Sequence, residues 1–354
     1  MVRDSLVAIR AWAPKWEPRH RKRNAIAILA LGAALLILAW TAPGPVRNAY
    51  TRMRTSVGSV VNLSLLERLR FADKGLALRL GRTTISGGFL HLPPTFRSTD
   101  GSYDLVMHFH GNVGLVEESF ALANVNAAVV VMNLGIGTGA YDQFFSNDAI
   151  VDVTMARIQD ELVQRGLEHP QLRRVALTAW SAGYGAVSRI LETGAFGESL
   201  DAVILLDGFH SSFDDQHRVD TKRLAAFEAF ARRAMRGERL FIITHSEVET
   251  ITYPTSKQTS DALLGMLGLS RTPGGTRPEW PAFKSSHGVD RDKIPPMQPT
   301  SEVRSGAFSV RGYGGGTKED HMQHLIFMAN LALPELAKRW NTPLGANLRA
   351  TPTK

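Results

Sequence analysis

The chain has 354 residues, of which 44% are hydrophobic and 21% charged, values typical of a globular protein with a sizeable core. It contains no cysteine, which excludes disulfides, thiolate catalysis and cysteine-based zinc or iron–sulfur sites. Its formal net charge is +8, but residues 1–54 hold ten of the 41 Lys and Arg residues and only two of the 33 Asp and Glu residues. The remaining 300 residues therefore carry 31 charges of each sign, a balance that argues against a nucleic-acid-binding groove.

The N-terminal region predicts a membrane anchor. Residues 25–42 are strongly apolar, and a helix of about 20 such residues spans a bilayer core of about 30 Å. The basic cluster at residues 19–23 precedes them, so the positive-inside rule keeps residues 1–24 as a cytoplasmic tail. A cleaved signal peptide and a buried core helix are the alternatives. We therefore expect a single-pass membrane protein with a signal-anchor helix, whose main domain is periplasmic or extracellular.

The rest of the chain is expected to form a linker, one large domain and a tail. Residues 43–75 are interpreted as a linker with a short helix over 57–71, residues 76–340 as the domain, and residues 341–354 as the C-terminal tail. Within the domain, residues 270–302 are rich in proline, glycine and charge, which indicates a loop insert.

The large domain is predicted to alternate strands with helices. It begins with two strands at residues 76–80 and 83–92, joined by Gly81 and Arg82. Six continuous apolar strands follow, at residues 105–109, 127–133, 175–178, 202–206, 240–244 and 307–311. Helices are expected at residues 116–123, 148–165, 184–192, 221–236, 256–267 and 321–331. This alternation predicts an α/β fold with a mostly parallel, doubly wound sheet and helices on both faces.

The strand at 175–178 leads into a candidate nucleophile. Residues 179–183 read Ala-Trp-Ser-Ala-Gly, a small-x-Ser-x-Gly pattern typical of a strained strand-to-helix turn that exposes the hydroxyl of Ser181. The backbone N–H of Ala182 is then one candidate oxyanion donor. The backbone N–H of Asn112, in the His-Gly-Asn turn after the strand at 105–109, is the other. A buried serine and an ordinary glycine turn are the alternative interpretations.

A catalytic serine needs a general base, which is expected at the carboxyl end of a later strand. His321 follows the strand at 307–311 and a glycine-rich loop, and it is the preferred base. His324 is the alternative, although we expect it one turn further into a helix.

Two carboxylates are candidates for the acid that orients the base. Asp207 follows the strand at 202–206 directly and has the shorter, stiffer side chain, so it is preferred. Glu247 follows the strand at 240–244 and remains open as the alternative acid. Ordinary turn or surface positions are the other interpretation for both.

Two further features are not expected to bind a metal or a cofactor. His321 and His324 with Asp320 form a loose cluster, whereas a metal ion needs three or four convergent ligands. The glycine-rich run at residues 135–139 lacks the strand–helix unit and later acid of a dinucleotide site, so we expect a loop near the rim of the active site.

The order of these motifs resembles the α/β-hydrolase superfamily over about residues 76–335. The His-Gly-Asn turn, the Ala-x-Ser-x-Gly turn, a later acid and a C-terminal Asp-His pair follow one another in the superfamily's order of serine, acid and histidine. Ala179 departs from the usual first glycine of the serine turn, a change that the superfamily tolerates when the residue is small.

The resemblance implies an α/β-hydrolase fold and a set of site residues. Ser181 corresponds to the nucleophile, His321 to the base, and the amides of Asn112 and Ala182 to the oxyanion donors. The acid stays open between the two carboxylates, since superfamily members place it after either of the two strands concerned.

These features together predict a membrane-anchored serine hydrolase. We expect a carboxylic-ester hydrolase that forms an acyl-enzyme on Ser181 and acts on a small-molecule or lipid-like ester without a cofactor. A peptidase or an acyltransferase on the same fold would use the same residues, because substrate choice depends on the shape of the pocket. A catalytically inactive, hydrolase-like binding module is the third alternative.

Overall fold

The computed structural model describes residues 71–73, 76–85, 87–147, 149–275, 289 and 294–341. The predicted cytoplasmic tail, the membrane helix, most of the linker and of the insert, and the C-terminal tail beyond residue 341 lie outside the described residues. The chain divides into two compact units, residues 1–65 and 66–354, and every described residue belongs to the second. Within the described residues, no helix has the length and apolar character that crossing a membrane requires.

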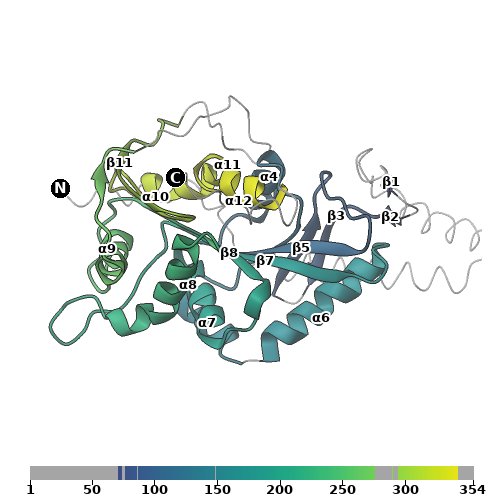
Figure 1. Cartoon of the computed structure of the whole chain (residues 1–354), viewed down its shortest axis with the longest axis horizontal. Coiled ribbons are helices and arrows are strands. Elements are labelled where there is room, and N and C mark those ends of the chain that lie inside the picture. The colour runs from purple at the N-terminus through teal and green to yellow at the C-terminus, as the bar shows by residue number, and fades with distance from the viewer. Residues whose placement is uncertain are drawn as a thin grey trace, which may run out of the picture. The chain divides into compact units, whose positions relative to one another are not determined.

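One ten-stranded sheet organises the described residues, in the order β10-β11-β12-β9-β8-β7-β5-β6-β4-β3 (Figure 1). Its six central strands are parallel: β6 (Ala128–Met132), β5 (Ser102–Phe109), β7 (Gln171–Trp180), β8 (Leu200–Leu206), β9 (Leu240–His245) and β12 (Phe308–Tyr313). Antiparallel strands form both edges: β4 (Gly88–Leu92) and β3 (Gly81–Ile85) at one, β11 (Pro299–Ser305) and β10 (Thr272–Pro273) at the other. The six predicted parallel strands are therefore confirmed. A separate two-stranded sheet pairs β1 (Phe71–Asp73) with β2 (Leu76–Leu78).

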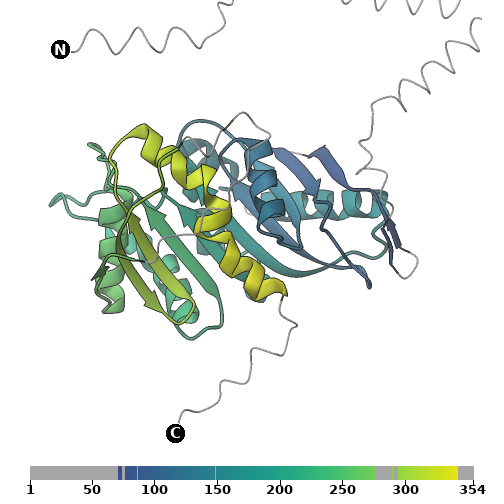
Figure 2. The ribbon, with the colours of Figure 1, turned by 90° about the horizontal axis from the view of Figure 1, so that it is seen from above.

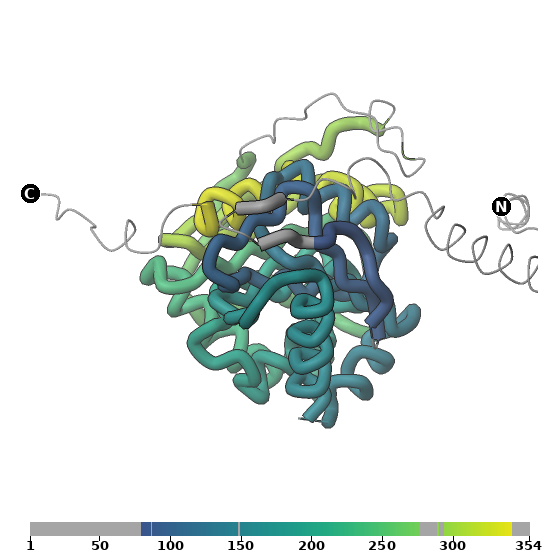
Figure 3. Tube along the Cα trace, turned by 90° about the vertical axis from the view of Figure 1, so that its right-hand side faces the viewer, coloured from purple at the N-terminus to yellow at the C-terminus, as the bar shows by residue number. Residues whose placement is uncertain are grey.

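Helices cover both faces of this sheet (Figures 1 and 3). One face carries α4 (Val113–Leu122), α10 (Lys318–Ile326), α11 (Met328–Leu331) and α12 (Leu333–Asn341). The other carries α5 (Thr138–Phe144), α6 (Ala149–Gln164), α7 (Tyr184–Thr193), α8 (Ala225–Met235) and α9 (Ser256–Leu267). Figure 2 shows α10, α11 and α12 crossing over the strands. Every residue of β6, β8 and β9 is buried, which is why residues 128–132, 202–206 and 240–243 are continuously apolar rather than alternating.

Some predicted element bounds were wrong. The predicted strand at 83–92 is the hairpin of β3 and β4, whose turn includes Gly87 at a φ of +77°. The predicted helix at 321–331 is divided between α10 and α11. Strand β11 lies partly in the predicted loop insert, and it lacks an apolar signal because Val303 is its one buried residue. Helices α5 and α12 were not predicted.

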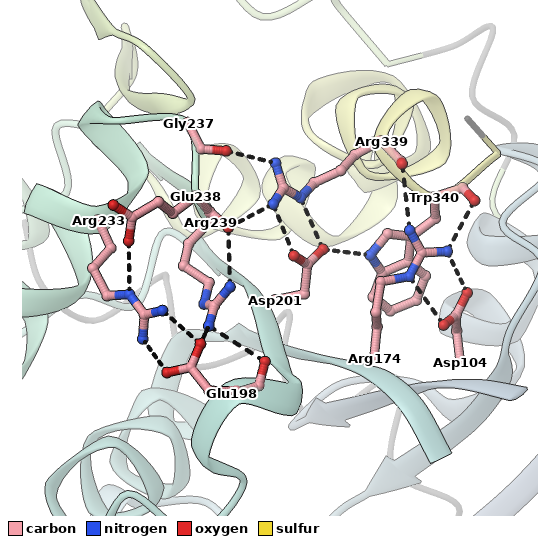
Figure 4. Close-up of polar contacts among 10 residues, drawn as sticks. All are labelled: Asp104, Arg174, Glu198, Asp201, Arg233, Gly237, Glu238, Arg239, Arg339 and Trp340. Carbon is pink, nitrogen blue, oxygen red and sulfur yellow. Dashed lines mark hydrogen bonds and ion pairs between the residues drawn. The ribbon is translucent and has the colours of Figure 1, made fainter. Parts of the chain in front are cut away.

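At the amino ends of the parallel strands, buried carboxylates are paired with arginines (Figure 4). Asp104, which is 1% exposed, receives hydrogen bonds from the guanidinium groups of Arg173 and Arg174. Asp201 accepts from Arg339, at 2.8 Å on each oxygen, and from the indole N–H of Trp340 at 2.7 Å. The first of these clusters joins β5 to β7, and the second fastens α12 to β8.

Candidate active site

The strand order of the sheet reverses at β5. The chain passes from β5 to β6 on one side and then returns to β7 on the other side of β5. Ligands of open α/β sheets bind at such a reversal, outside the carboxyl ends of the strands. The His-Gly-Asn turn follows β5 and the serine turn follows β7, so both predicted motifs lie at this point.

The first residue after each of β5, β7 and β8 has a strained backbone. These residues are His110, Ser181 and Asp207, with φ values of +70°, +51° and +44°. Such conformations cost non-glycine residues on the order of 1–3 kcal/mol each and persist only where the surroundings enforce them. Two of the three are residues that the sequence had singled out for catalysis.

Close packing enforces the serine turn. Residues Ser181–Gly183 form the short 3₁₀ helix η2, between β7 and α7. A Cβ atom added at Gly183 would lie 2.1 Å from the carbonyl oxygen of Phe109, at the end of β5. A Cβ at Gly208 would lie 2.3 Å from the carbonyl oxygen of Ser181. Glycine at both positions therefore lets the turn fit between the ends of β5 and β8.

Asp207 contacts the predicted base. Nδ1 of His321 donates to Oδ2 of Asp207 at 2.7 Å. The hydroxyl and the backbone N–H of Ser246 donate to the same carboxylate, at 2.6 and 2.8 Å. Because an ionised carboxylate can only accept, this arrangement fixes the proton of His321 on Nδ1 and leaves Nε2 free to take up another.

The environment of Asp207 keeps it ionised. Burial works to raise the pKa of this carboxyl, which is 4% exposed, but nearby His324 and His321 and the hydrogen bonds from His321 and Ser246 outweigh it and hold the pKa below its usual range. Burial lowers the pKa of His324 to about 4, so that ring is uncharged near neutral pH. Near neutral pH, the interactions that favour the ionised form of Asp207 are therefore those with His321 and Ser246.

Three aromatic rings are stacked beside the serine. Trp180 stacks on His321 with ring centroids 4.7 Å apart, and on His110 with centroids 5.2 Å apart and an interplanar angle of 10°. Its indole N–H also donates to the backbone carbonyl of His321 at 3.1 Å. Nδ1 of His110 is 2.8 Å from the hydroxyl of Tyr141. The residue before Ser181 therefore holds both the ring and the backbone of His321.

The two predicted oxyanion donors lie at the starts of helices. Asn112 caps α4, and its side-chain oxygen accepts from the N–H of Leu115 at 3.0 Å. Within the part of the chain that the structure describes, the backbone N–H of Asn112 has no hydrogen-bond partner. Ala182 is the second residue of η2, where a helix still has free N–H groups. Both N–H groups are thus available to a ligand at the carboxyl ends of β5 and β7.

The alternative acid and the alternative base are placed elsewhere. Glu247 is exposed, its backbone N–H donates to Gly315, and among the described residues its carboxylate makes no hydrogen bond to His321. His324 is fully buried one turn beyond His321, with Nδ1 2.7 Å from the hydroxyl of Thr244. Asp320 accepts from Thr317 in the capping box of α10. The described residues contain no cluster of three or more ligands able to hold a metal ion.

The sequence reasoning missed three residues of this site. Ser246, which donates twice to Asp207, directly follows β9, so its position at a strand end was a usable signal. Trp180 and His110 lie next to residues that were singled out, but nothing in their sequence context indicates that their rings stack.

The parallel sheet, the serine turn after β7 and the Asp–His pair together are those of the α/β-hydrolase fold. No protein-family model and no curated protein matches the sequence. Among solved structures, the chain is similar to a poly(3-hydroxybutyrate) depolymerase from Bordetella parapertussis, with 14% identity over 68% of this chain and 82% of that one and a TM-score of 0.38. It is also similar to an arylesterase, with 12% identity over 83% of this chain and 99% of that one and a TM-score of 0.35. A third is the ferric enterobactin esterase of Salmonella typhimurium, with 12% identity, 50% and 45% coverage and a TM-score of 0.31.

Proposed function

We propose that this protein is a serine hydrolase that cleaves carboxylic esters. The observation that carries the proposal is the hydrogen bond between Nδ1 of His321 and Asp207, formed beside the strained turn of Ser181. A serine and a buried, ionised acid at the ends of the neighbouring strands β7 and β8, with a histidine hydrogen-bonded to the acid, are the parts that acyl transfer needs.

In the proposed reaction, Oγ of Ser181 attacks the acyl carbonyl carbon while its proton passes to Nε2 of His321. The carboxylate of Asp207 stabilises the resulting imidazolium through Nδ1. The backbone N–H groups of Asn112 and Ala182 bind the oxyanion of the tetrahedral intermediate.

Collapse of this intermediate completes the first half of the reaction. His321 returns the proton to the alkoxide, the alcohol leaves, and the acyl group stays on Ser181. Water then gives a proton to His321 and attacks the acyl-enzyme, which releases the carboxylic acid and restores the serine hydroxyl.

A fluorophosphonate probe tests the nucleophile directly. The intact protein is expected to be labelled at Ser181, and the Ser181→Ala variant to remain unlabelled. Absence of labelling in the intact protein, or undiminished labelling of the variant, contradicts the proposal.

We further propose that residues 25–42 anchor the enzyme in a membrane, with the hydrolase domain on the periplasmic or extracellular side. The support is the apolar stretch and the preceding basic cluster in the sequence. A reporter enzyme that folds only outside the cytoplasm, fused to the C-terminus, is expected to be active. An inactive fusion beside an active cytoplasmic reporter fusion contradicts this orientation.

A further inference from the structure

A second set of aromatic rings lies beside Ser181, and the catalytic groups do not use it. Tyr184 and His210 are packed edge to face with ring centroids 5.4 Å apart, and His210 and Tyr253 likewise at 4.9 Å. We call these three residues the aromatic wall. Its members come from the start of α7, from the loop after β8 and from the loop after β9.

The aromatic wall begins at the nucleophile. Tyr184 is three residues after Ser181 and directly follows the 3₁₀ helix η2, at the start of α7. His210 is two residues after Gly208, which packs directly against the backbone of Ser181. The charges of Asp207 and His321 both act on the pKa of His210, which places that ring near the acid and the base.

The wall lies on the opposite side of the serine from the catalytic histidine. Trp180, which stacks on His321, belongs to the core beneath α4 and α10. Tyr184 packs instead on the core of the other face, with α5, α7 and α9. A substrate held at Ser181 therefore has the catalytic stack on one side and the aromatic wall on the other.

The wall is exposed at one of its three rings. Tyr253 is 43% exposed, and the two most exposed large hydrophobic residues, Ile136 at 97% and Ile251 at 91%, lie in the loops after β6 and β9. In the sheet, β7 is two strands from each of β6 and β9, about 10 Å at ordinary strand spacing.

The ring nitrogens of His210 are engaged within the protein. Nδ1 of His210 donates to the carbonyl oxygen of Pro254 at 2.9 Å, and its Nε2 is 3.4 Å from the hydroxyl of Ser256. Burial lowers the pKa of His210, so the ring is uncharged near neutral pH. The exposed surface thus offers ring faces and edges rather than a charge.

We propose that the aromatic wall is a substrate subsite that binds an aromatic ring of the ester, so that Ser181 acts preferentially on ring-bearing esters. A ring of the substrate continues the edge-to-face arrangement of the three rings, which is a favourable geometry for aromatic pairs. This inference rests on the proposed hydrolase function for its consequence in turnover, but the binding of a ring is testable without turnover.

The first experiment compares kcat/KM for methyl phenylacetate and benzyl acetate with that for methyl acetate, by titration of the released acid with the full-length protein. In Tyr253→Ala, the preference for at least one of the two ring-bearing esters is expected to fall about 3- to 10-fold, a range set by the strength of one aromatic pair. The ester that loses preference shows whether the ring belongs to the acyl or to the alcohol part. Tyr253→Leu keeps apolar bulk without a ring and is expected to lose preference as well.

The matched control is Leu122→Ala, on the exposed surface of α4 at 45% exposure, which is expected to keep both ratios. Unchanged ratios in Tyr253→Ala, or an equal change in Leu122→Ala, overturn the proposal.

The second experiment separates the subsite from the reaction. N-methyl-2-phenylacetamide is added to the full-length Ser181→Ala protein, and saturation transfer to its ring protons is measured by NMR. Transfer that weakens in the Ser181→Ala, Tyr253→Ala double variant supports the subsite even if the wild-type protein hydrolyses no ester, a result that would contradict only the proposed function. Ester hydrolysis by the wild type with no ring transfer to either protein overturns the subsite and leaves the hydrolase function standing.

Discussion

The two ends of the parallel strands both bury carboxylates, but they pair them with different partners. At the amino ends, Asp104 and Asp201 are bound by arginines, whose charge is permanent. At the carboxyl ends, Asp207 is bound by His321 and Ser246, an imidazole that can exchange protons and a neutral hydroxyl. The same residue type therefore serves as a fixed ion-pair partner at one end and as part of a proton-transfer system at the other.

The backbone conformation also differs between the two ends of the parallel strands. The carboxyl ends of β5, β7 and β8 are followed by three residues at positive φ, and two of these are the proposed nucleophile and acid. The amino ends of these strands are tied to α12 by hydrogen bonds that extend to the backbone carbonyl of Trp340. The rigid end supports the sheet, so that the other end can hold strained residues in place.

Removing the charge of Asp207 is expected to have the largest effect on activity. In Asp207→Asn the amide no longer requires a proton on Nδ1 of His321, and in Ser-His-Asp systems such a change lowers kcat by about 10⁴-fold. Ester hydrolysis measures the loss. Glu247→Gln is the matched control, since that carboxylate is exposed and makes no hydrogen bond to His321; equal losses in both variants would falsify the assignment of the acid.

Breaking an ion pair at the amino ends is expected to affect stability rather than catalysis. Arg174→Met leaves the buried Asp104 with Arg173 alone, so the cost is expected to exceed about 1 kcal/mol but to stay below the about 3–5 kcal/mol of a buried charge left without a partner. Urea unfolding measures the change, while kcat of the folded protein stays near the wild-type value. In the exposed pair of Arg218 and Asp214, Arg218→Met is expected to cost no more than about 1 kcal/mol. A similar loss of unfolding free energy in both variants contradicts the prediction that the buried pair stabilises the protein more than the exposed pair.

The two ends are also expected to respond to acid over different ranges. Burial lowers the pKa of His108 to about 3 and of His245 and His324 to about 4, and all three lie in or near the carboxyl half of the sheet. The unfolded chain binds protons at these residues more readily than the folded protein does. Their protonation therefore lowers the free energy of unfolding as the pH falls from about 6.5 toward the pKa values of the folded protein, and the full stability is present above about pH 6.5. Each of these histidines lowers the free energy of unfolding by at most about 1.4 kcal/mol per pH unit.

Asp201 at the amino ends behaves differently. Burial works to raise its pKa, but the hydrogen bonds and charge of Arg339 hold the value below the usual one, so its contribution is complete above about pH 4 and is lost only below it. The pH dependence of the free energy of unfolding checks both ranges. Its slope between about pH 6 and pH 5 is expected to decrease in His324→Gln and to stay unchanged in His169→Asn, an exposed position. A slope that does not change in His324→Gln contradicts the prediction.

The smallest expected effect concerns the ring that supports the base. Trp180→Leu removes both the stacking on His321 and the indole N–H, and kcat is expected to fall about 10-fold with KM little changed. Trp180→Phe retains a ring and is expected to recover part of the loss. A Trp180→Phe variant as impaired as Trp180→Leu points to the N–H bond rather than to stacking.

The sequence by itself determined the architecture of the described domain. Six apolar strands alternate with helices, and strands buried on both faces cannot carry the alternating pattern of exposed ones, so β6, β8 and β9 were recognisable. The turn of Ser181 was recognisable for a related reason. Its neighbour Gly183 leaves room for the end of β5, a constraint that is visible in consecutive residues.

Only the tertiary structure decided which groups meet across strands. Asp207 and Glu247 both follow parallel strands, and the sequence alone does not show which of the two carboxylates is buried against the histidine. The order β9-β8-β7 and the return of α10 over the sheet bring His321 to Asp207 and to Trp180, residues separated from it by 114 and 141 positions. Edge strand β11, with a single buried residue, also escaped prediction, because its position depends on pairing with β12 and not on its own hydrophobic pattern.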